Sequence, residues 1–446
     1  MLETIAIKPR ERDAILQALR AGVVPKLGLQ HIQVGRAREV EEMIKDIARI
    51  GEGGASIRFI IGEYGAGKTF FLNLVRLVAL ERKLVVMNAD LAPSRRLYAT
   101  DGQARSLFNE LSRNLATRTK PEGGALGSIV ERFIASALSD AHANGQDLDD
   151  VIQQRLAPLQ DLVSGFDFAT VLAHYARSYD QGDDEGKVAA LRWLRAEYST
   201  RTDARTALGV RDIIDDGKFY DYLKLLAAFV KLAGYDGLLV VLDEMVNLYK
   251  LNNAQARNSN YEQILRIVND VLQGGASRIG FLMGGTPEFL MDTRRGLYSY
   301  PALQSRLAEN GFARDGLLDL SGPVIRLQNL SPEDLFVLLR NIRNVFASND
   351  SSKILLPNEA LVGFMEHCSK KIGDAYFRTP RNSVTAFVNL LSVLEQNPGT
   401  RWQDLVGGVE LAPDLPAEKA LSEPILTGAD PVATPASDDE LTKFRL

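Results

Sequence analysis

Five short apolar runs, separated by longer amphipathic stretches, set the pattern of hydrophobic and polar positions along this 446-residue chain. Nearly continuous apolar character is typical of strands that are buried on both faces of a parallel sheet. Because helical periodicity fills most of the intervals between the runs, the pattern predicts an α/β fold whose parallel sheet has helices on both faces. The predicted strands are residues 57–61, 83–88, 237–243, 278–283 and 324–327.

The interval between the second and third strands is too long for a simple crossover. Residues 91–233 carry helical periodicity over most of their length, whereas connections between strands in compact domains are much shorter. We therefore expect a large inserted helical subdomain at this place. Its predicted helices span 104–117, 126–144, 149–162, 168–179, 187–197 and 212–233.

The other segments complete a predicted order of domains. Residues 1–90 comprise N-terminal helices and the first part of the sheet domain, and residues 234–330 comprise its second part. A capping serine and a proline at 331–332 then open a group of helices, which predicts a C-terminal helical lid at 331–400. The helices expected outside the insertion are 8–26, 37–50, 261–273, 332–347, 357–372 and 379–396.

The last segment, residues 401–446, is acidic and contains several Pro, Ala and Ser residues, a composition that is typical of disordered tails. Apolar side chains return at its end, at Leu441, Phe444 and Leu446. Leu441 and Phe444 are three residues apart and would share one face of a helix. We therefore expect a docking peptide at this end, and an unused terminus is the alternative.

A glycine-rich loop follows the first predicted strand. Residues 62–69 read Gly-Glu-Tyr-Gly-Ala-Gly-Lys-Thr, which matches the phosphate-binding pattern G-x-x-x-x-G-K-[ST]. Its glycines allow backbone N–H groups to face a polyphosphate, and the next helix directs its positive dipole end at the same place. Lys68 would neutralise phosphate oxygens and Thr69 would bind Mg²⁺; the alternative is an ordinary glycine-rich turn. The predicted nucleotide-binding residues of this loop are Gly62, Gly65, Ala66, Gly67, Lys68, Thr69 and Phe70.

Polar residues follow two later strands, where the ligands of a parallel sheet bind. Nucleotide hydrolysis requires one carboxylate to orient Mg²⁺ and another to polarise the attacking water. Asp243 is predicted to orient Mg²⁺, and Glu244 is predicted to polarise the water. The alternative is a solvated acidic turn. Thr286, after the fourth strand, could contact the γ-phosphate or the attacking water. It could equally cap the helix that Pro287 begins.

Arg306, between the fourth and fifth strands, is a candidate for the arginine that offsets transition-state charge on the γ-phosphate. At this position it would reach the nucleotide of a neighbouring subunit. Arg294, Arg295 and Arg314 are rivals, and a plain surface charge is the alternative for each of them.

Two further places predict contacts with a nucleotide. Arg381 lies just inside the third lid helix and could bridge the lid to the phosphates, with Arg378 as its rival. Both could simply decorate a helix start, although cations are mildly unfavourable there. Gly35 and Arg36 precede the glycine-rich loop by about 30 residues, and their segment could fold over the adenine or be only a loop before a helix.

Composition and charge exclude several classes of protein. The single cysteine, Cys368, excludes an intrachain disulfide, and the four histidines lack the spacing of a zinc site. No apolar run is long enough to predict a transmembrane helix, and the first residues lack the apolar core of a signal peptide, so we expect a cytoplasmic protein. The net charge of −5 argues against a general coat of nucleic acid but leaves a local basic patch open.

These motifs together resemble a known family. The sheet, the glycine-rich loop and the lid are similar to AAA+ ATPases of the initiator clade, near the origin-recognition proteins. More closely, the chain resembles the BrxD-type ATP-binding proteins of BREX phage-defence loci. The segments that carry the resemblance are 62–71, 165–172, 191–194, 234–244 and 377–381.

The resemblance implies ATP or ADP as the ligand, with Mg²⁺. It also implies a helicase, a methyltransferase and a phosphatase-like protein as partners. The chain departs from the pattern at 284–286, where Gly-Gly-Thr replaces the asparagine often found there, and a DNA-binding winged helix is not evident. The residues that would carry ATP and Mg²⁺ by resemblance are Gly62, Gly65, Gly67, Lys68, Thr69, Asp243 and Glu244.

The sequence therefore predicts a Mg²⁺-dependent ATPase, slow or stimulated by a partner, that acts as a nucleotide switch or assembly factor in a DNA-directed defence complex. Homo-oligomers and contact with double-stranded DNA are part of this expectation. One alternative is a transposition-regulator or replication-initiator ATPase that assembles on DNA. Another is a scaffold that does not hydrolyse the nucleotide and is only stabilised by it.

Overall fold

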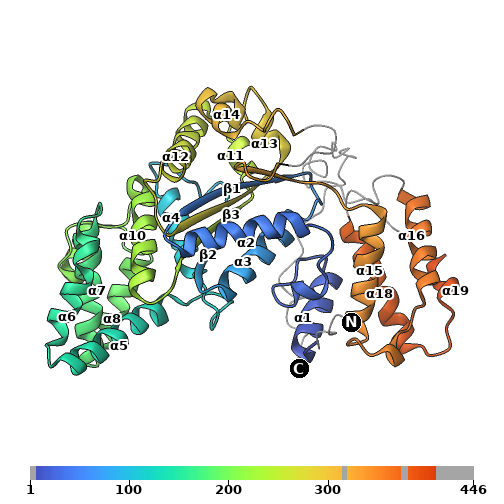
Figure 1. Cartoon of the computed structure of the whole chain (residues 1–446), viewed down its shortest axis with the longest axis horizontal. Helices are drawn as coiled ribbons and strands as arrows, with labels where there is room; N and C mark the ends of the chain where they lie inside the picture. Colours follow the sequence, from blue (N-terminus) through green and yellow to red (C-terminus); the bar gives the residue numbers. More distant parts are fainter. Residues whose placement is uncertain (1–6, 314–318, 373–379, 408–446) are drawn as a thin grey trace, which may run out of the picture.

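A computed structural model describes residues 7–313, 319–372 and 380–407. Its centre is a five-stranded parallel sheet in the order β2-β3-β4-β1-β5 (Figure 1). All five predicted strands are confirmed, with ends that move by at most a few residues. They are β1 (Ala55–Gly62), β2 (Leu84–Asp90), β3 (Gly237–Asp243), β4 (Ile279–Gly285) and β5 (Val324–Leu327).

The sheet is buried on both faces, as its apolar runs predict. Alternate residues of β3 enter different clusters: Leu238 and Val240 pack in one, and Leu239 and Val241 in the other. Helices α2 (Ala37–Gly51) and α3 (Lys68–Glu81) cover the second of these faces. Helices α4 (Gln103–Arg113), α10 (Phe219–Leu232) and α12 (Ala254–Leu272) contribute to the first. The parallel α/β architecture is therefore confirmed.

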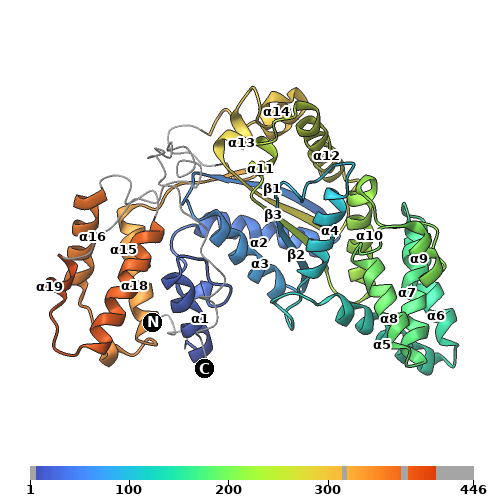
Figure 2. The same ribbon diagram turned by 180° about the vertical axis from the view of Figure 1, so that it is seen from behind.

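The segment between β2 and β3 is helical, and α5 to α9 gather beyond α10 at one end of the molecule (Figures 1 and 2). Aromatic rings hold this group together, since the Trp193 ring packs edge-on against Phe168 and Tyr222. The helix predicted over 212–233 begins later, at Phe219. A short helix that the pattern does not predict, α9 (Arg201–Leu208), precedes it. The other helices here are α5 (Leu126–Asn144), α6 (Leu148–Gln160), α7 (Gly165–Asp180) and α8 (Asp184–Leu194).

Three short helices lie between β3 and β5, and the sequence anticipated only the one that Pro287 begins, as an alternative role for Thr286. They are α11 (Val246–Tyr249), α13 (Pro287–Met291) and α14 (Pro301–Leu307). Each is too short to show a helical period, although prolines at the first positions of α13 and α14 mark where those two begin.

A second body is formed by the C-terminal bundle, which we define as α15 (Pro332–Phe346), α16 (Asn358–Ile372), α18 (Pro380–Gln396) and α19 (Trp402–Val406). The N-terminal helix α1 (Pro9–Arg20) packs against α18 and α15 of this bundle (Figure 1). Helix α19 occupies the start of the segment expected to be a tail. The rest of that tail, including Leu441, Phe444 and Leu446, lies outside the described residues.

No helix in the described ranges is both long enough and apolar enough to cross a membrane.

Candidate functional site

The turn from β1 into α3 forms the glycine-rich loop. Gly65 and Gly67 have φ angles of 84° and 82°, in the left-handed region that other residues rarely adopt. Gly67 is the N-cap of α3, and because glycine has no side chain, the first N–H groups of the helix receive no side-chain cap from it. The loop therefore presents backbone donors at a helix N-terminus, an arrangement suited to an anion.

Lys68 lies at the start of α3 with its ammonium group folded back onto the loop. Its Nζ donates to the carbonyl oxygens of Gly62 and Glu63, both at 2.9 Å. Burial lowers the pKa of Lys68, and the nearby carboxylates of Asp243 and Glu244 oppose that shift. A cation held only by neutral carbonyls in a partly buried position has a strong electrostatic reason to accept an anionic partner.

Thr69 and Asp243 meet at the carboxyl ends of β1 and β3. The Thr69 hydroxyl donates to Oδ2 of Asp243 at 2.7 Å, and the backbone N–H of Glu244 donates to Oδ1 at 2.8 Å. Asp243 is buried. No described group of three or more His, Cys, Asp or Glu is placed to hold a metal by itself. A hydroxyl beside one carboxylate nevertheless fits Mg²⁺, which takes few protein ligands and completes its shell with water and phosphate oxygens.

Glu244 adopts a left-handed backbone conformation, with φ of 55°. Such a conformation in a residue other than glycine is uncommon and is often found at functional sites. Burial raises the pKa of the Glu244 carboxyl, and the charges of Asp243 and Asp90 raise it further. The proton-accepting oxygen atoms of this side chain are thus in an environment that increases their basicity, as a general base requires.

Asp90, at the carboxyl end of β2, is a third carboxylate near Asp243 and Glu244, and the sequence analysis did not predict it. It is the cross-strand partner of Asp243 in the β2–β3 pairing. Burial raises its pKa, as does the charge of Asp243. The signal was present, because β2 ends in an aspartate just as β3 does, but only the pairing of these two strands places the carboxylates side by side.

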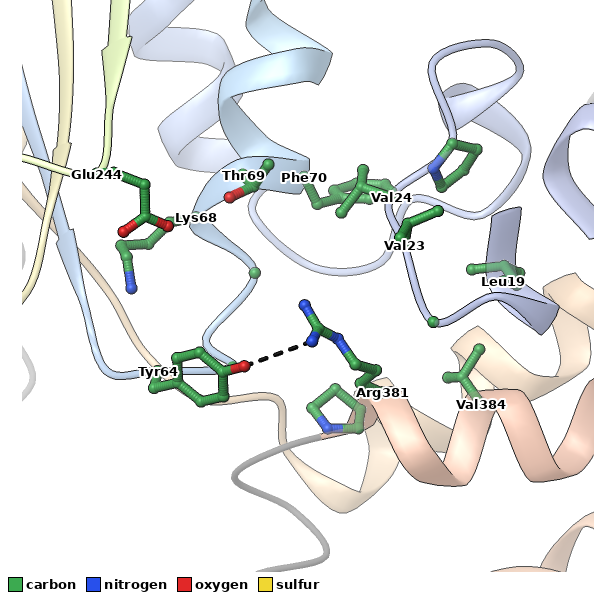
Figure 3. A pocket seen from close by; sticks show the side chains of 15 residues that line it. Leu19, Val23, Val24, Tyr64, Lys68, Thr69, Phe70, Glu244, Arg381 and Val384 are labelled. Carbon is green, nitrogen blue, oxygen red and sulfur yellow. Dashed lines mark hydrogen bonds between the residues drawn. The ribbon is translucent and has the colours of Figure 1, made fainter. Parts of the chain in front are cut away.

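A first cavity, of about 230 Å³, lies in front of the loop (Figure 3). The structure brings Lys68, Thr69, Glu244 and Arg381 to its wall. Arg381 extends from the start of α18, and its Nη1 donates to the Tyr64 hydroxyl at 3.4 Å. The remaining wall comes from loop residues, from α18 and from the end of α1: Leu19, Gly22, Val23, Val24, Pro25, Gly65, Gly67, Phe70, Pro380 and Val384.

A second cavity, of about 130 Å³, adjoins the first, because Gly65, Gly67 and Phe70 line both. Its wall is mainly apolar and includes Ile32, Val34, Ala66, Phe71, Leu74, Leu330 and Leu338. A small and mostly apolar cavity next to an anion site suits the base of a nucleotide.

Arg36 lines the second cavity and forms hydrogen bonds to two segments beside it. It caps the start of α2 in a left-handed conformation. Its Nη2 donates to the carbonyl oxygen of Ala66, at 3.2 Å, and to that of Gln328 just after β5. Gly35 lies against the first turn of α15, where a Cβ would meet Oδ1 of Asp334 at 3.4 Å. The segment at 35–36 therefore joins the loop, β5 and the C-terminal bundle.

Two other predicted site residues lie elsewhere. Thr286 is the N-cap of α13 and accepts a hydrogen bond from the Phe289 N–H, the alternative role that the sequence allowed. Arg306 donates to the side chain of Asn269 on α12 and to the carbonyl of Ala302. Neither Thr286 nor Arg306 occurs among the described residues that line the two cavities. The rivals Arg314 and Arg378 lie outside the described residues.

A family model described as "BREX system ATP-binding protein BrxC/D" matches residues 7–410 of the chain. This span includes every strand of the sheet and both cavities. No curated protein matches the chain.

Proposed function

Because the chain belongs to the BREX system ATP-binding protein BrxC/D family, we propose that its two adjoining cavities hold one ATP molecule, in a P-loop domain of the AAA+ type. The family gives the chain an ATP-binding role in phage defence. The observation that carries the proposal is the convergence of Lys68, Thr69, Glu244 and Arg381 on one cavity in front of a glycine-rich loop.

The phosphates take the first cavity. Their oxygens replace the carbonyls of Gly62 and Glu63 as partners of Lys68, exchanging neutral acceptors for charged ones. Arg381 turns from Tyr64 towards the γ-phosphate. Thr69 and Asp243 would hold Mg²⁺, which would neutralise phosphate charge when bound. Glu244 would accept a proton from the attacking water as the water oxygen bonds to the γ-phosphorus, the bond to the bridging oxygen breaks and ADP leaves.

The base takes the second cavity. Its faces contact the apolar side chains of Ile32, Val34 and Leu338, and Arg36 keeps the segment at 32–36 fixed to the loop. The ribose bridges the cavities near Phe70, which lines both. This placement accounts for Arg36, Ala66 and Phe70 as nucleotide-binding residues through one ligand, whereas Gly35 is not among the described residues that line either cavity.

Hydrolysis is proposed to be slow or stimulated by a partner. The Thr286 hydroxyl, after β4, accepts the hydrogen bond that caps α13, and Thr286 is not among the described residues that line either cavity. The role that follows is a nucleotide-driven switch or assembly factor in a DNA-directed defence complex. A scaffold that binds ATP without hydrolysing it is the second candidate, and the engaged Thr286 favours it as well.

Steady-state ATP turnover of the full chain tests the proposal, with Mg²⁺ or EDTA and with or without double-stranded DNA. The matched variant is Glu244→Gln, which keeps the volume and removes the base. Turnover that needs Mg²⁺ and is lost in Glu244→Gln supports the ATPase. ATP binding with no turnover under any condition supports the scaffold, and no ATP binding contradicts both. Mass photometry with and without ATP then tests for a homo-oligomer.

A further inference from the structure

The N-terminal helix is attached to the C-terminal bundle by contacts along its whole length. Ile15 and Leu16 are buried in the same apolar cluster as Leu339 and Leu391. Polar contacts fix its two ends. Near the start, Nε of Arg12 donates to the carbonyl oxygen of Phe346 at 2.9 Å. At the other end, Nη2 of Arg20 donates to the Ser392 hydroxyl at 2.7 Å. Helix α1 therefore moves with the bundle that carries Arg381.

The end of α1 is fixed by a glycine turn. Gly22 has φ of 68°, and its N–H donates to the Leu19 carbonyl at 3.1 Å. The Val23 N–H donates back to the Ala18 carbonyl at 2.9 Å. These two bonds define a Schellman motif, in which a left-handed residue stops the helix and reverses the chain. The reversal sends residues 23–25 along the wall of the first cavity.

This turn lies close to the stem of Arg381. A Cβ at Gly22 would lie 3.4 Å from Cδ of Arg381 and 3.5 Å from its Cγ, which is van der Waals contact. One turn further along α18, the Thr385 hydroxyl donates to the Leu19 carbonyl at 2.9 Å. Figure 3 shows the Arg381 side chain between the 22–24 segment and Tyr64. The direction of the guanidinium group thus depends on where the end of α1 lies.

We infer that α1 and its Gly22 turn position Arg381 for the phosphates, so that nucleotide binding and the docking of α1 on the bundle are coupled. Gly22 and Thr385 are the positioning residues. Coupling is reciprocal: if docked α1 improves the affinity for ATP, bound ATP stabilises the docking of α1 by the same factor. The inference rests on the proposed function, in that ATP is taken to occupy the first cavity. It adds a part of the chain, residues 9–25, that would report the nucleotide state.

Amide hydrogen exchange on the full chain measures the reciprocal effect. Peptides that cover residues 9–25 should exchange several-fold more slowly in saturating MgATP than without nucleotide. In Arg381→Met, which keeps an apolar stem beside the Gly22 turn and removes the guanidinium group, this slowing should disappear at saturating MgATP while exchange without nucleotide stays near that of the wild type. Slowing that persists in Arg381→Met, or no slowing in the wild type, overturns the inference.

A matched pair of variants measures the direct effect on affinity. Thr385→Val removes the hydroxyl that holds the end of α1 but leaves Arg381 in place, and Thr385→Ser restores it. We expect Thr385→Val to lose about two- to tenfold in ATP affinity, the range of one neutral hydrogen bond. ADP, which lacks the γ-phosphate, should lose less. Thr385→Ser and the exposed Gln17→Ala on α1 should match the wild type.

The outcomes separate this inference from the proposed function. A wild-type chain that does not bind ATP contradicts the proposed function. A chain that binds ATP, with equal affinities in Thr385→Val and Gln17→Ala, leaves the proposed function intact and overturns the coupling. Equal losses for ATP and ADP in Thr385→Val would mean that α1 acts on overall stability and not through Arg381, which also overturns it.

Discussion

Replacing Gly284 by alanine should damage the Mg²⁺ site although no predicted ligand is itself replaced. Gly284 lies at the end of β4, beside Asp243 on β3. A Cβ there would lie 2.4 Å from Oδ1 of Asp243 and 2.8 Å from Cδ1 of Leu72, far inside van der Waals contact. The carboxylate must therefore shift, although its two oxygens accept hydrogen bonds from the Thr69 hydroxyl and the Glu244 N–H.

The size of the effect follows from those contacts. A hydrogen bond to a charged group contributes about 1.5–3 kcal/mol. Losing one of the two that orient Asp243 should lower the affinity for MgATP by roughly 10- to 150-fold. Overpacking should also lower the free energy of unfolding by about 1–3 kcal/mol.

Calorimetric titration with ATP, in Mg²⁺ and in EDTA, isolates the relevant part of the affinity. In the wild type, ATP should bind more tightly in Mg²⁺ than in EDTA, and Gly284→Ala should lose most of this increase in affinity. Gly285→Ala is the matched control, because its Cβ would crowd the Phe289 ring, at 2.6 Å from Cδ1, and not Asp243. Gly285→Ala should lower the free energy of unfolding to a similar degree but keep the increase in ATP affinity that Mg²⁺ gives. A full Mg²⁺ gain in Gly284→Ala would refute this reasoning.

Three further predictions concern Glu244 and Arg306. Glu244→Gln should bind ATP as the wild type does but turn it over at least about 100-fold more slowly, since a positioned general base contributes that much; wild-type turnover would remove Glu244 from the base role. Burial and neighbouring carboxylates raise the pKa of Glu244 in the folded chain, so its ionisation costs stability as pH rises from below its unfolded pKa through its folded one. Nucleotide-free melting in EDTA should therefore show Glu244→Gln more stable than the wild type at pH 8 and closer to it at pH 4; an equal difference at both would contradict the shift. Arg306 is proposed to act on a neighbouring subunit's nucleotide, so mixing Arg306→Ala with Lys68→Ala protein should partly restore ATP turnover. No restoration, with specific activity flat across concentrations that span assembly, would leave Arg306 as the residue that ties α14 to α12 through Asn269.

The strands were predictable because burial on both faces leaves them mostly apolar, and in the four-residue β5 only Arg326 is polar. The short helices were not predictable. Helix α9 buries only Ala204 and Leu208, four residues apart, which is too few to define a period. The predicted range of helix α1 was too long because apolar residues continue past Gly22. Glycine is common at the position after a helix, but the backbone conformation of Gly22 shows that the helix ends there.

The candidate site divides in the same way. Residues 62–69 are adjacent in the chain, so one motif specifies them together, and Asp243 and Glu244 follow directly from a strand end. The pairing of β2 with β3 brings Asp90 to this edge, and no single segment contains that information. Likewise, the packing of α1 on the C-terminal bundle places Gly22 close to the side chain of Arg381. Sequence periodicity says which face of a helix is buried but not against which partner.

The central claim is that the glycine-rich loop binds the triphosphate of ATP through Lys68. Calorimetric titration of MgATP into the wild type and into Lys68→Ala tests it most directly, with Lys45→Ala, an exposed lysine on α2, as the control for the loss of one positive charge. The account predicts saturable binding with one ATP per chain in the wild type and Lys45→Ala, and no measurable binding in Lys68→Ala. Equal ATP affinity in the wild type and Lys68→Ala would contradict it.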